Sequence, residues 1–171
     1  MEPVKDDAAL YQEYADQVMK FLLCLTGSYD LAEELTQETF YQAYKSIHRY
    51  DGSCKLSVWL CQIAKHLYYD HLKKQKHAAP VPFEDAAEGA AADGTPEEDL
   101  LAREKMRSLY RAVHRLREPY REVLILRLYM GLPFREIGEV FGGKTESWAR
   151  TTFYRGKLQV KEDMMQYENS V

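Results

Sequence analysis

The feature that most constrains the fold is the stretch 80–100, which carries seven acidic side chains, no basic ones and few large apolar groups. Such a composition cannot bury enough apolar surface to offset the entropy of ordering the backbone. The stretch is therefore predicted to be an acidic, flexible linker. It separates residues 1–79 from residues 101–171, and each of these segments has the size of one small domain.

Both flanking segments have the periodicity of α-helices. Apolar residues recur at steps of three and four, and no alternating run is long enough to indicate a strand. The predicted helices lie at about 7–26, from about 30 onward, and at about 57–76, 96–116, 119–130, 133–141 and 146 to beyond 161. The chain is therefore expected to be all-α, with two small helical domains.

Two helix starts are expected from their capping residues. Asp30 with Glu33 resembles a capping arrangement, and Thr95 is followed by a proline and then by Glu98 at the third helical position. In the helix at 57–76 the side chains expected to face inward are Leu60, Ile63, Ala64, Leu67 and Leu72.

The charge of the chain is unevenly distributed. The net charge of −4 divides into −2 over residues 1–79, −7 over residues 80–100 and +5 over residues 101–171. A basic segment of this kind predicts a polyanion as partner. The overall acidity argues against a protein that coats nucleic acid nonspecifically on its own.

Composition argues against several other classes of protein. No apolar run reaches the roughly 20 residues of a transmembrane helix, and the first residues lack the pattern of a signal peptide, so the chain is expected to be cytoplasmic. Cys24, Cys54 and Cys61 form no C-x-x-C pair and are expected to be free thiols. No cofactor, metal site or small-molecule substrate is predicted.

An enzyme is the weaker alternative. His66, Asp70 and His71 could begin a metal or hydrolytic site, with Glu34 and Glu38 as further carboxylates. The chain has no H-E-x-x-H motif, no phosphate-cradling glycine loop and no serine elbow. No catalytic residue is therefore predicted.

The last two predicted helices have the layout of a helix-turn-helix. A short helix containing Gly138 is followed by the turn at 142–143 and then by a basic helix. Small polar and basic side chains on the outward side of that helix could reach base edges and phosphates; they are Ser147, Arg150, Thr151, Tyr154 and Lys161. An ordinary helical hairpin with a solvated basic face remains an alternative.

The first domain has two surfaces of unusual composition. Along the helix at 57–76, Trp59, Tyr68 and Tyr69 interleave with lysines and histidines, a combination that suits unstacked bases and phosphates. These aromatics could equally belong to the core. An acidic ridge on the preceding helix, formed by Glu33, Glu34, Gln37 and Glu38, could bind a basic partner helix or simply keep its own helix soluble.

Four groups of residues, in order along the chain, resemble the successive motifs of bacterial extracytoplasmic-function (ECF) sigma factors of the sigma-70 family. They are 31–40 (LAEELTQETF), 57–65 (SVWLCQIAK), 120–124 (YREVL) with 133–138 (PFREIG), and 153–157 (FYRGK). The resemblance implies that residues 1–79 form sigma region 2 and residues 101–171 form sigma region 4. The chain departs from the family at Lys65-His66, where Arg-Asn is common.

The resemblance also implies roles for individual residues. Docking on the coiled-coil of the largest polymerase subunit is expected from Asp30, Glu33, Glu34, Gln37 and Glu38. Capture of a flipped base of the promoter −10 element is expected from Ser53, Cys54 and Lys55, and reading and melting of that element from Trp59, Lys65, His66, Tyr69 and Lys73. Recognition of the −35 element is expected from Lys144, Thr145, Ser147, Arg150, Thr151, Tyr154, Arg155 and Lys157.

The function implied is that of a promoter-specificity subunit without catalysis of its own. Its expected partners are core RNA polymerase, through the largest-subunit coiled-coil and the flap, promoter DNA, and an anti-sigma factor that is typically anchored in the membrane. The alternative is a stand-alone helix-turn-helix regulator that binds duplex DNA without polymerase. Duplex affinity in the absence of core enzyme would distinguish the two.

Overall fold

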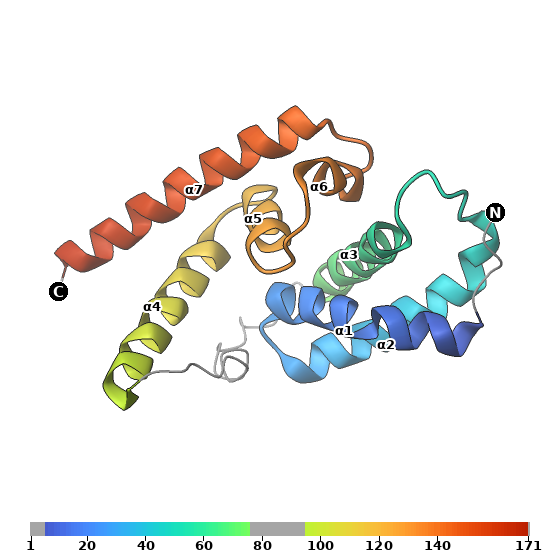
Figure 1. Cartoon of the computed structure of the whole chain (residues 1–171), viewed down its shortest axis with the longest axis horizontal. Coiled ribbons are helices and arrows are strands. Elements are labelled where there is room, and N and C mark those ends of the chain that lie inside the picture. Colours follow the sequence, from blue (N-terminus) through green and yellow to red (C-terminus); the bar gives the residue numbers. More distant parts are fainter. Residues whose placement is uncertain (1–5, 76–94, 171) are drawn as a thin grey trace.

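The computed structural model describes residues 6–75 and 95–170, and within these ranges every regular element is a helix (Figure 1). The N-terminal unit consists of α1 (Asp7–Thr26), α2 (Tyr29–Ser46), the short 3-10 turn η1 (Ile47–Arg49) and α3 (Leu56–Lys74). The C-terminal unit consists of α4 (Pro96–Arg115), α5 (Tyr120–Leu128), α6 (Phe134–Val140) and α7 (Glu146–Asn169). The all-α prediction is confirmed.

The N-terminal unit is a three-helix bundle in which each helix contacts the other two. Its core is formed by the fully buried side chains of Phe21, Leu22, Phe40, Val58 and Leu60. α1 ends at Gly27, whose φ of 66° is a left-handed conformation that glycine adopts without strain. The chain can therefore turn at once into α2.

The predicted cap of α2 is wrong. α2 begins one residue before Asp30, and its N-cap is Ser28, whose hydroxyl accepts a hydrogen bond from the backbone N–H of Leu31 at 3.4 Å. Serine offers the acceptor that the first turn needs. Asp30 instead lies within the first turn, where its negative charge interacts favourably with the helix dipole.

The predicted start of the helix at 96–116 is confirmed. The hydroxyl of Thr95 accepts from the N–H of Glu98 at 3.4 Å, and the Glu98 carboxylate accepts from the N–H of Thr95 at 3.5 Å. Most of the predicted linker falls on residues 76–94, outside the described residues.

The helix-turn-helix of the C-terminal unit depends on close backbone approach at Gly138. A Cβ at this position would lie 2.2 Å from the carbonyl oxygen of Lys144, so only glycine lets α6 and the turn before α7 pack together. The inward side of α7 is buried at Ala149, Phe153, Gly156 and Val160.

One inward prediction on α3 is wrong. Leu60 and Ala64 are buried, and Ile63 and Leu67 are partly buried, but Leu72 is 43% exposed. It lies in the last turn of α3, where the exposed side chains of its neighbours Lys73 and Lys74 show that α3 has run beyond its packing partners.

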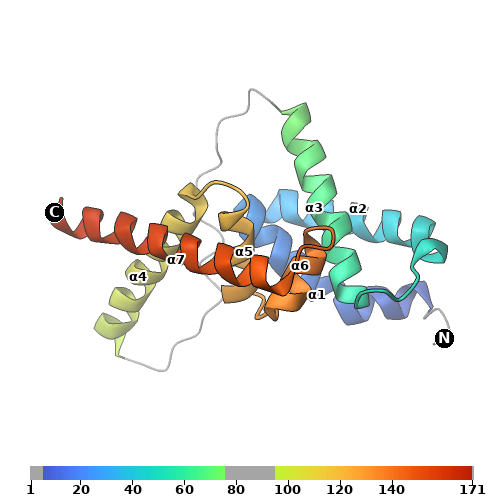
Figure 2. The ribbon, with the colours of Figure 1, turned by 90° about the horizontal axis from the view of Figure 1, so that it is seen from above.

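The two units pack against each other. α3 contacts α6 and α1 contacts α5, and the view from above shows α6 lying against α3 (Figure 2). By contrast, the N-terminal half of α4 and the C-terminal half of α7 extend away from the N-terminal unit (Figure 1). The interface between the units therefore involves α3, which carries most of the residues expected to bind the −10 element.

Candidate nucleic-acid interface

One face of α7 is open to solvent. We call it the α7 face; its residues are Lys144, Thr145, Ser147, Arg150, Thr151, Tyr154, Arg155 and Lys157, and all eight are exposed. The opposite side of α7 packs on α5 and α6. Its charged members are all basic, which suits contact with a polyanion, and the exposed carboxylate of Glu146 beside them is paired with Arg150.

Two side chains of the α7 face already have partners within the chain. The hydroxyl of Thr145 caps α7 by accepting from the N–H of Trp148 at 3.0 Å. The guanidinium of Arg150 donates to the Glu146 carboxylate at 3.0 Å and lies 5.4 Å from the ring centroid of Phe134. These contacts hold Arg150 at the start of the helix that would enter a groove.

The acidic ridge lies on the solvent side of α2. Asp30, Glu33, Glu34 and Gln37 are exposed and Glu38 is half-buried, with its carboxylate accepting from Gln42 at 2.8 Å. Among the described helices, α2 contacts only elements of its own unit. The acidic ridge is therefore not covered by the C-terminal unit.

The residues expected to bind the −10 element are divided by the interface between the units. We call them the α3 face: Ser53, Cys54, Lys55, Trp59, Lys65, His66, Tyr69 and Lys73. Ser53, Lys55, His66 and Lys73 are exposed, whereas Lys65 and Tyr69 are partly buried against α5 and the end of α6. The structure thus brings only part of the predicted set to a free surface.

Lys65 and Tyr69 converge on Glu122 of α5. The ammonium of Lys65 is 3.4 Å from one carboxylate oxygen of Glu122, and the Tyr69 hydroxyl donates to the other at 2.9 Å. Glu122 is fully buried, and burial raises the pKa of its carboxyl while Lys65 opposes that rise. Lys65 also lies 3.5 Å from the ring centroid of Phe141, just beyond α6.

The loop before α3 also contacts α6. Lys55 forms an ion pair with Glu136 at 2.5 Å, and Gln62 donates to the backbone carbonyl of Glu139. The loop and α6 together line a groove whose walls include Cys54, Lys55, Glu136 and Glu139. The carboxylates of α6 thus face the loop expected to hold a flipped base.

Arg121 is a key residue that the sequence analysis left without a role. Its guanidinium donates to the backbone carbonyl of Leu25 at 3.0 Å and to the Tyr68 hydroxyl at 3.3 Å, both in the N-terminal unit. In its own unit it contacts Nδ1 of His114 at 3.1 Å and the Glu118 carboxylate at 2.6 Å. The signal was present, since YREVL places an Arg-Glu pair inside an apolar helix.

The C-terminal unit caps the end of α1. Helix ends leave their last carbonyls without intrahelical donors. The carbonyl of Leu25 accepts from Arg121, and that of Cys24 accepts from the Tyr110 hydroxyl at 3.3 Å. A cation at a helix C-terminus is further favoured by the helix dipole.

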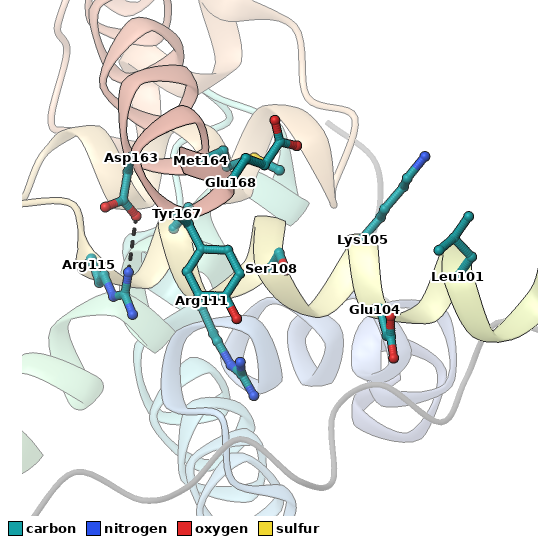
Figure 3. Close-up of a pocket in the computed structure, with 11 residues that line it drawn as sticks. Leu101, Glu104, Lys105, Ser108, Arg111, Arg115, Asp163, Met164, Tyr167 and Glu168 are labelled. Atoms are coloured by element: carbon teal, nitrogen blue, oxygen red, sulfur yellow. Dashed lines mark hydrogen bonds and ion pairs between the residues drawn. The ribbon is translucent and has the colours of Figure 1, made fainter. Parts of the chain in front are cut away.

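A cavity of about 230 Å³ lies where α4 and α7 diverge (Figure 3). Apolar side chains of Leu101, Met164 and Tyr167 line it, and Arg115 is joined to Asp163 at 3.3 Å across its inner end. Leu101 and Tyr167 are each more than half exposed. This surface suits an apolar segment of a partner.

Other classes of site find no support in the described ranges. No three His, Cys, Asp or Glu side chains of residues 6–75 and 95–170 come close enough to hold a metal ion together. None of the helices described there is long and apolar enough to span a bilayer. Cys24, Cys54 and Cys61 are free thiols, and burial raises the pKa of Cys61 to about 12.

Both units match known protein families. Residues 10–78 match Sigma-70 region 2, and residues 106–160 match Sigma-70, region 4. Over 152 residues the chain is 31% identical to the ECF RNA polymerase sigma factor SigM of Bacillus subtilis, with 89% of this chain and 91% of that protein covered. The chain belongs to the ECF RNA polymerase sigma factors.

Further comparisons agree. This ECF sigma factor is 26% identical to the RNA polymerase sigma factor YlaC of Bacillus subtilis, over 91% of this chain and 90% of that protein. Its fold is similar to that of the sigma factor RpoE of Bartonella quintana, solved in complex with the anti-sigma factor NepR. That superposition has a TM-score of 0.70 at 20% identity and covers 95% of this chain and 98% of the other.

Proposed function

We propose that this ECF sigma factor docks on core RNA polymerase through the acidic ridge, recognises the −35 element with the α7 face and the −10 element with the α3 face, and has no catalysis of its own. The observation that carries this proposal is that the acidic ridge and the α7 face lie uncovered on different units. One chain can then hold the polymerase and the DNA at the same time.

The acidic ridge suits a basic helical partner. Glu34, Gln37 and Glu38 occupy neighbouring positions on one side of α2, and Tyr41, 56% exposed, lies next along that side. Carboxylates that can form salt bridges with a basic partner, beside an exposed aromatic side chain, are typical of a specific protein interface. The partner proposed is the coiled-coil of the largest polymerase subunit.

The α7 face suits the major groove. Small hydroxyl side chains near the start of α7 can approach base edges, and Arg150 can bind guanine with two hydrogen bonds if it leaves Glu146. Arg155 and Lys157 are exposed further along α7, which supports the proposal that they bind phosphate.

The cavity between α4 and α7 is the proposed contact for the polymerase flap. Its lining combines the apolar side chains of Leu101 and Met164 and the ring of Tyr167 with charged neighbours, which suits an amphipathic segment of that partner. An anti-sigma factor that covers any of these surfaces would hold the protein inactive, and we propose such a partner, anchored in the membrane, as the regulator.

Run-off transcription tests the proposed function. Core polymerase and a pool of genomic promoter fragments would be incubated with this protein, with a Glu34→Arg/Glu38→Arg variant, and with a Glu97→Arg/Glu162→Arg control that changes the charge equally elsewhere. We expect discrete transcripts with the protein and with the control. The ridge variant should lose them, because two reversed charges would repel a basic partner.

Other outcomes would reassign the function or the docking surface. Transcripts that survive the ridge variant would leave the sigma function in place and remove the acidic ridge as the docking surface. No transcript on any fragment, together with tight binding of duplex DNA by the protein alone, would favour the stand-alone regulator.

A further inference from the structure

The α3 face is met by groups that imitate nucleic acid. Lys55 faces the Glu136 carboxylate, Lys65 faces that of Glu122, and the ring of Phe141 lies under the Lys65 ammonium. Carboxylates are the anions that most resemble phosphates in a protein, and an aromatic ring resembles a base in its shape and its π-face. The partners of Lys55 and Lys65 are thus of the kinds that single-stranded DNA would supply.

We propose that the free chain is closed on itself, with α6 and the start of α5 occupying the DNA-binding surface of α3 in place of the −10 strand. This inference rests on the proposed function of the α3 face. Lys65 and Tyr69 cannot contact Glu122 and the −10 strand at the same time, because both side chains converge on a fully buried Glu122. A DNA strand can bind the Lys65 ammonium and the Tyr69 hydroxyl only after both groups leave Glu122.

The composition of this interface suits reversible closure. Polar and charged groups make several of its direct contacts, among them those of Arg121, Glu122, Lys65 and Tyr68. Burying charges costs hydration free energy that their mutual attraction only partly offsets. The charges regain their hydration when the units separate. The raised pKa of Glu122 is consistent with such a cost. Interfaces of this kind between domains commonly open.

Closure leaves the acidic ridge and the α7 face free. α2 makes no contact with a described helix of the C-terminal unit, and all eight residues of the α7 face are exposed. Core polymerase can therefore capture the closed chain through α2, and the second unit can then move off α3. The inference thus predicts that α3 binds DNA only weakly until docking, which would limit unproductive binding of single strands by the free protein.

The test is single-stranded DNA binding by the free, full-length chain. The opening variant is Arg121→Met/Glu136→Lys, which removes the contacts of Arg121 with Leu25 and Tyr68 and that of Glu136 with Lys55. It leaves every residue of the α3 face in place. A Glu162→Gln control changes the net charge by the same amount, one unit, at an exposed site on α7. The probe is a fluorescein-labelled pool of random 20-nucleotide DNA strands, and the radius of gyration is measured by X-ray scattering.

We expect the opening variant to have a larger radius of gyration and to bind the pool about tenfold more tightly, because the affinity of a mostly closed protein is reduced by its small open fraction. The control should match the unmodified chain in both respects. An expanded variant with unchanged DNA affinity would overturn the inference, as would a gain no larger than that of the control. Circular dichroism would confirm that the helices persist.

A second measurement uses the unmodified chain, so it does not depend on how the variant folds. A carbodiimide should join Lys55 to Glu136 directly, since their charged atoms are 2.5 Å apart. Saturating single-stranded DNA should suppress this cross-link, and a yield that stays constant would contradict the inference. Transcription with core polymerase is a separate test of the proposed function. If the chain directs transcripts but these binding and cross-linking results are not obtained, the closed state is refuted and the proposed function stands.

Discussion

His114 shows how one half-buried side chain can make the contact between the units sensitive to acid. It stacks on Tyr110 at a ring-centroid distance of 3.9 Å, and its Nδ1 faces the Arg121 guanidinium. Because Arg121 is a donor, this nitrogen must be an acceptor, which requires the neutral ring. Burial, and then Arg121, lowers the pKa of His114 to about 4 from the ordinary 6.5.

The sign of the pH effect follows. The unfolded chain binds a proton on His114 below pH 6.5, whereas the folded chain does so only near pH 4. The stabilisation from His114 is therefore complete above pH 6.5 and is lost as the pH falls toward 4, with a slope of at most about 1.4 kcal/mol per pH unit. Glu122 acts in the opposite sense, because its pKa is raised.

A His114→Gln variant isolates this contribution, since the glutamine side chain keeps an acceptor but cannot titrate. Urea unfolding of both proteins at pH 7 and pH 5 is the measurement. We expect the free-energy difference between the two proteins to shrink at the lower pH. A difference that is equal at both values would show that His114 is not held neutral in the folded chain.

A substitution at Arg121 tests how much its planar guanidinium contributes to the free energy of unfolding. An Arg121→Lys variant keeps the charge but cannot reach Leu25, Tyr68 and Glu118 together. Leaving buried partners unsatisfied should lower the free energy of unfolding by about 2 kcal/mol. An Arg103→Lys control, at an exposed pair with Asp99, should change it by less than about 0.5 kcal/mol. Equal effects would remove Arg121 as the link between the units.

At the scale of the elements, two glycines predict different costs. A Cβ at Gly138 would meet the Lys144 backbone carbonyl at 2.2 Å, whereas one at Gly156 would meet the Leu124 side chain at 2.5 Å. The backbone carbonyl cannot move aside as easily as a leucine methyl group can. We therefore expect Gly138→Ala to cost about 3 kcal/mol and Gly156→Ala about 1 kcal/mol in urea unfolding. The reverse order would show that the turn between α6 and α7 is not fixed by this contact.

The elements were largely predictable because helix formation and burial on one face follow local periodicity. The start of α4 was placed by Thr95 and Glu98, and spacing along a single helix predicted the outward positions of Ser147, Arg150, Thr151 and Tyr154. The prediction of Asp30 as the cap was wrong because Ser28, two residues earlier, already supplies the acceptor for the first turn. Leu72 failed because periodicity does not say where packing partners end.

The α3 face was less predictable for a different physical reason. Whether Lys65 and Tyr69 are open depends on Glu122, which is more than fifty residues away in the chain. No local pattern encodes such a contact. The Arg-Glu pair within YREVL was the only sequence signal, and it indicated buried charges without identifying their partners.

At the scale of the whole molecule, the position of the charges determines how salt acts. Lys55 of the Lys55–Glu136 pair is 71% exposed and open to screening, whereas Lys65 and Glu122 are 14% and 0% exposed. Buried pairs are screened much less. Raising the salt to about 0.5 M should therefore leave the radius of gyration unchanged. Expansion in salt would show that surface pairs hold the units together.

The capping of α1 by the other unit has a consequence for anything that separates the two. Once Arg121 and Tyr110 withdraw, the carbonyls of Leu25 and Cys24 need new donors. Water can supply them only if that helix end becomes wet, and a docked protein can supply them directly. A binding partner that offers hydrogen-bond donors at this helix end would replace those that Arg121 and Tyr110 withdraw. Its binding would therefore favour the separated state of the two units.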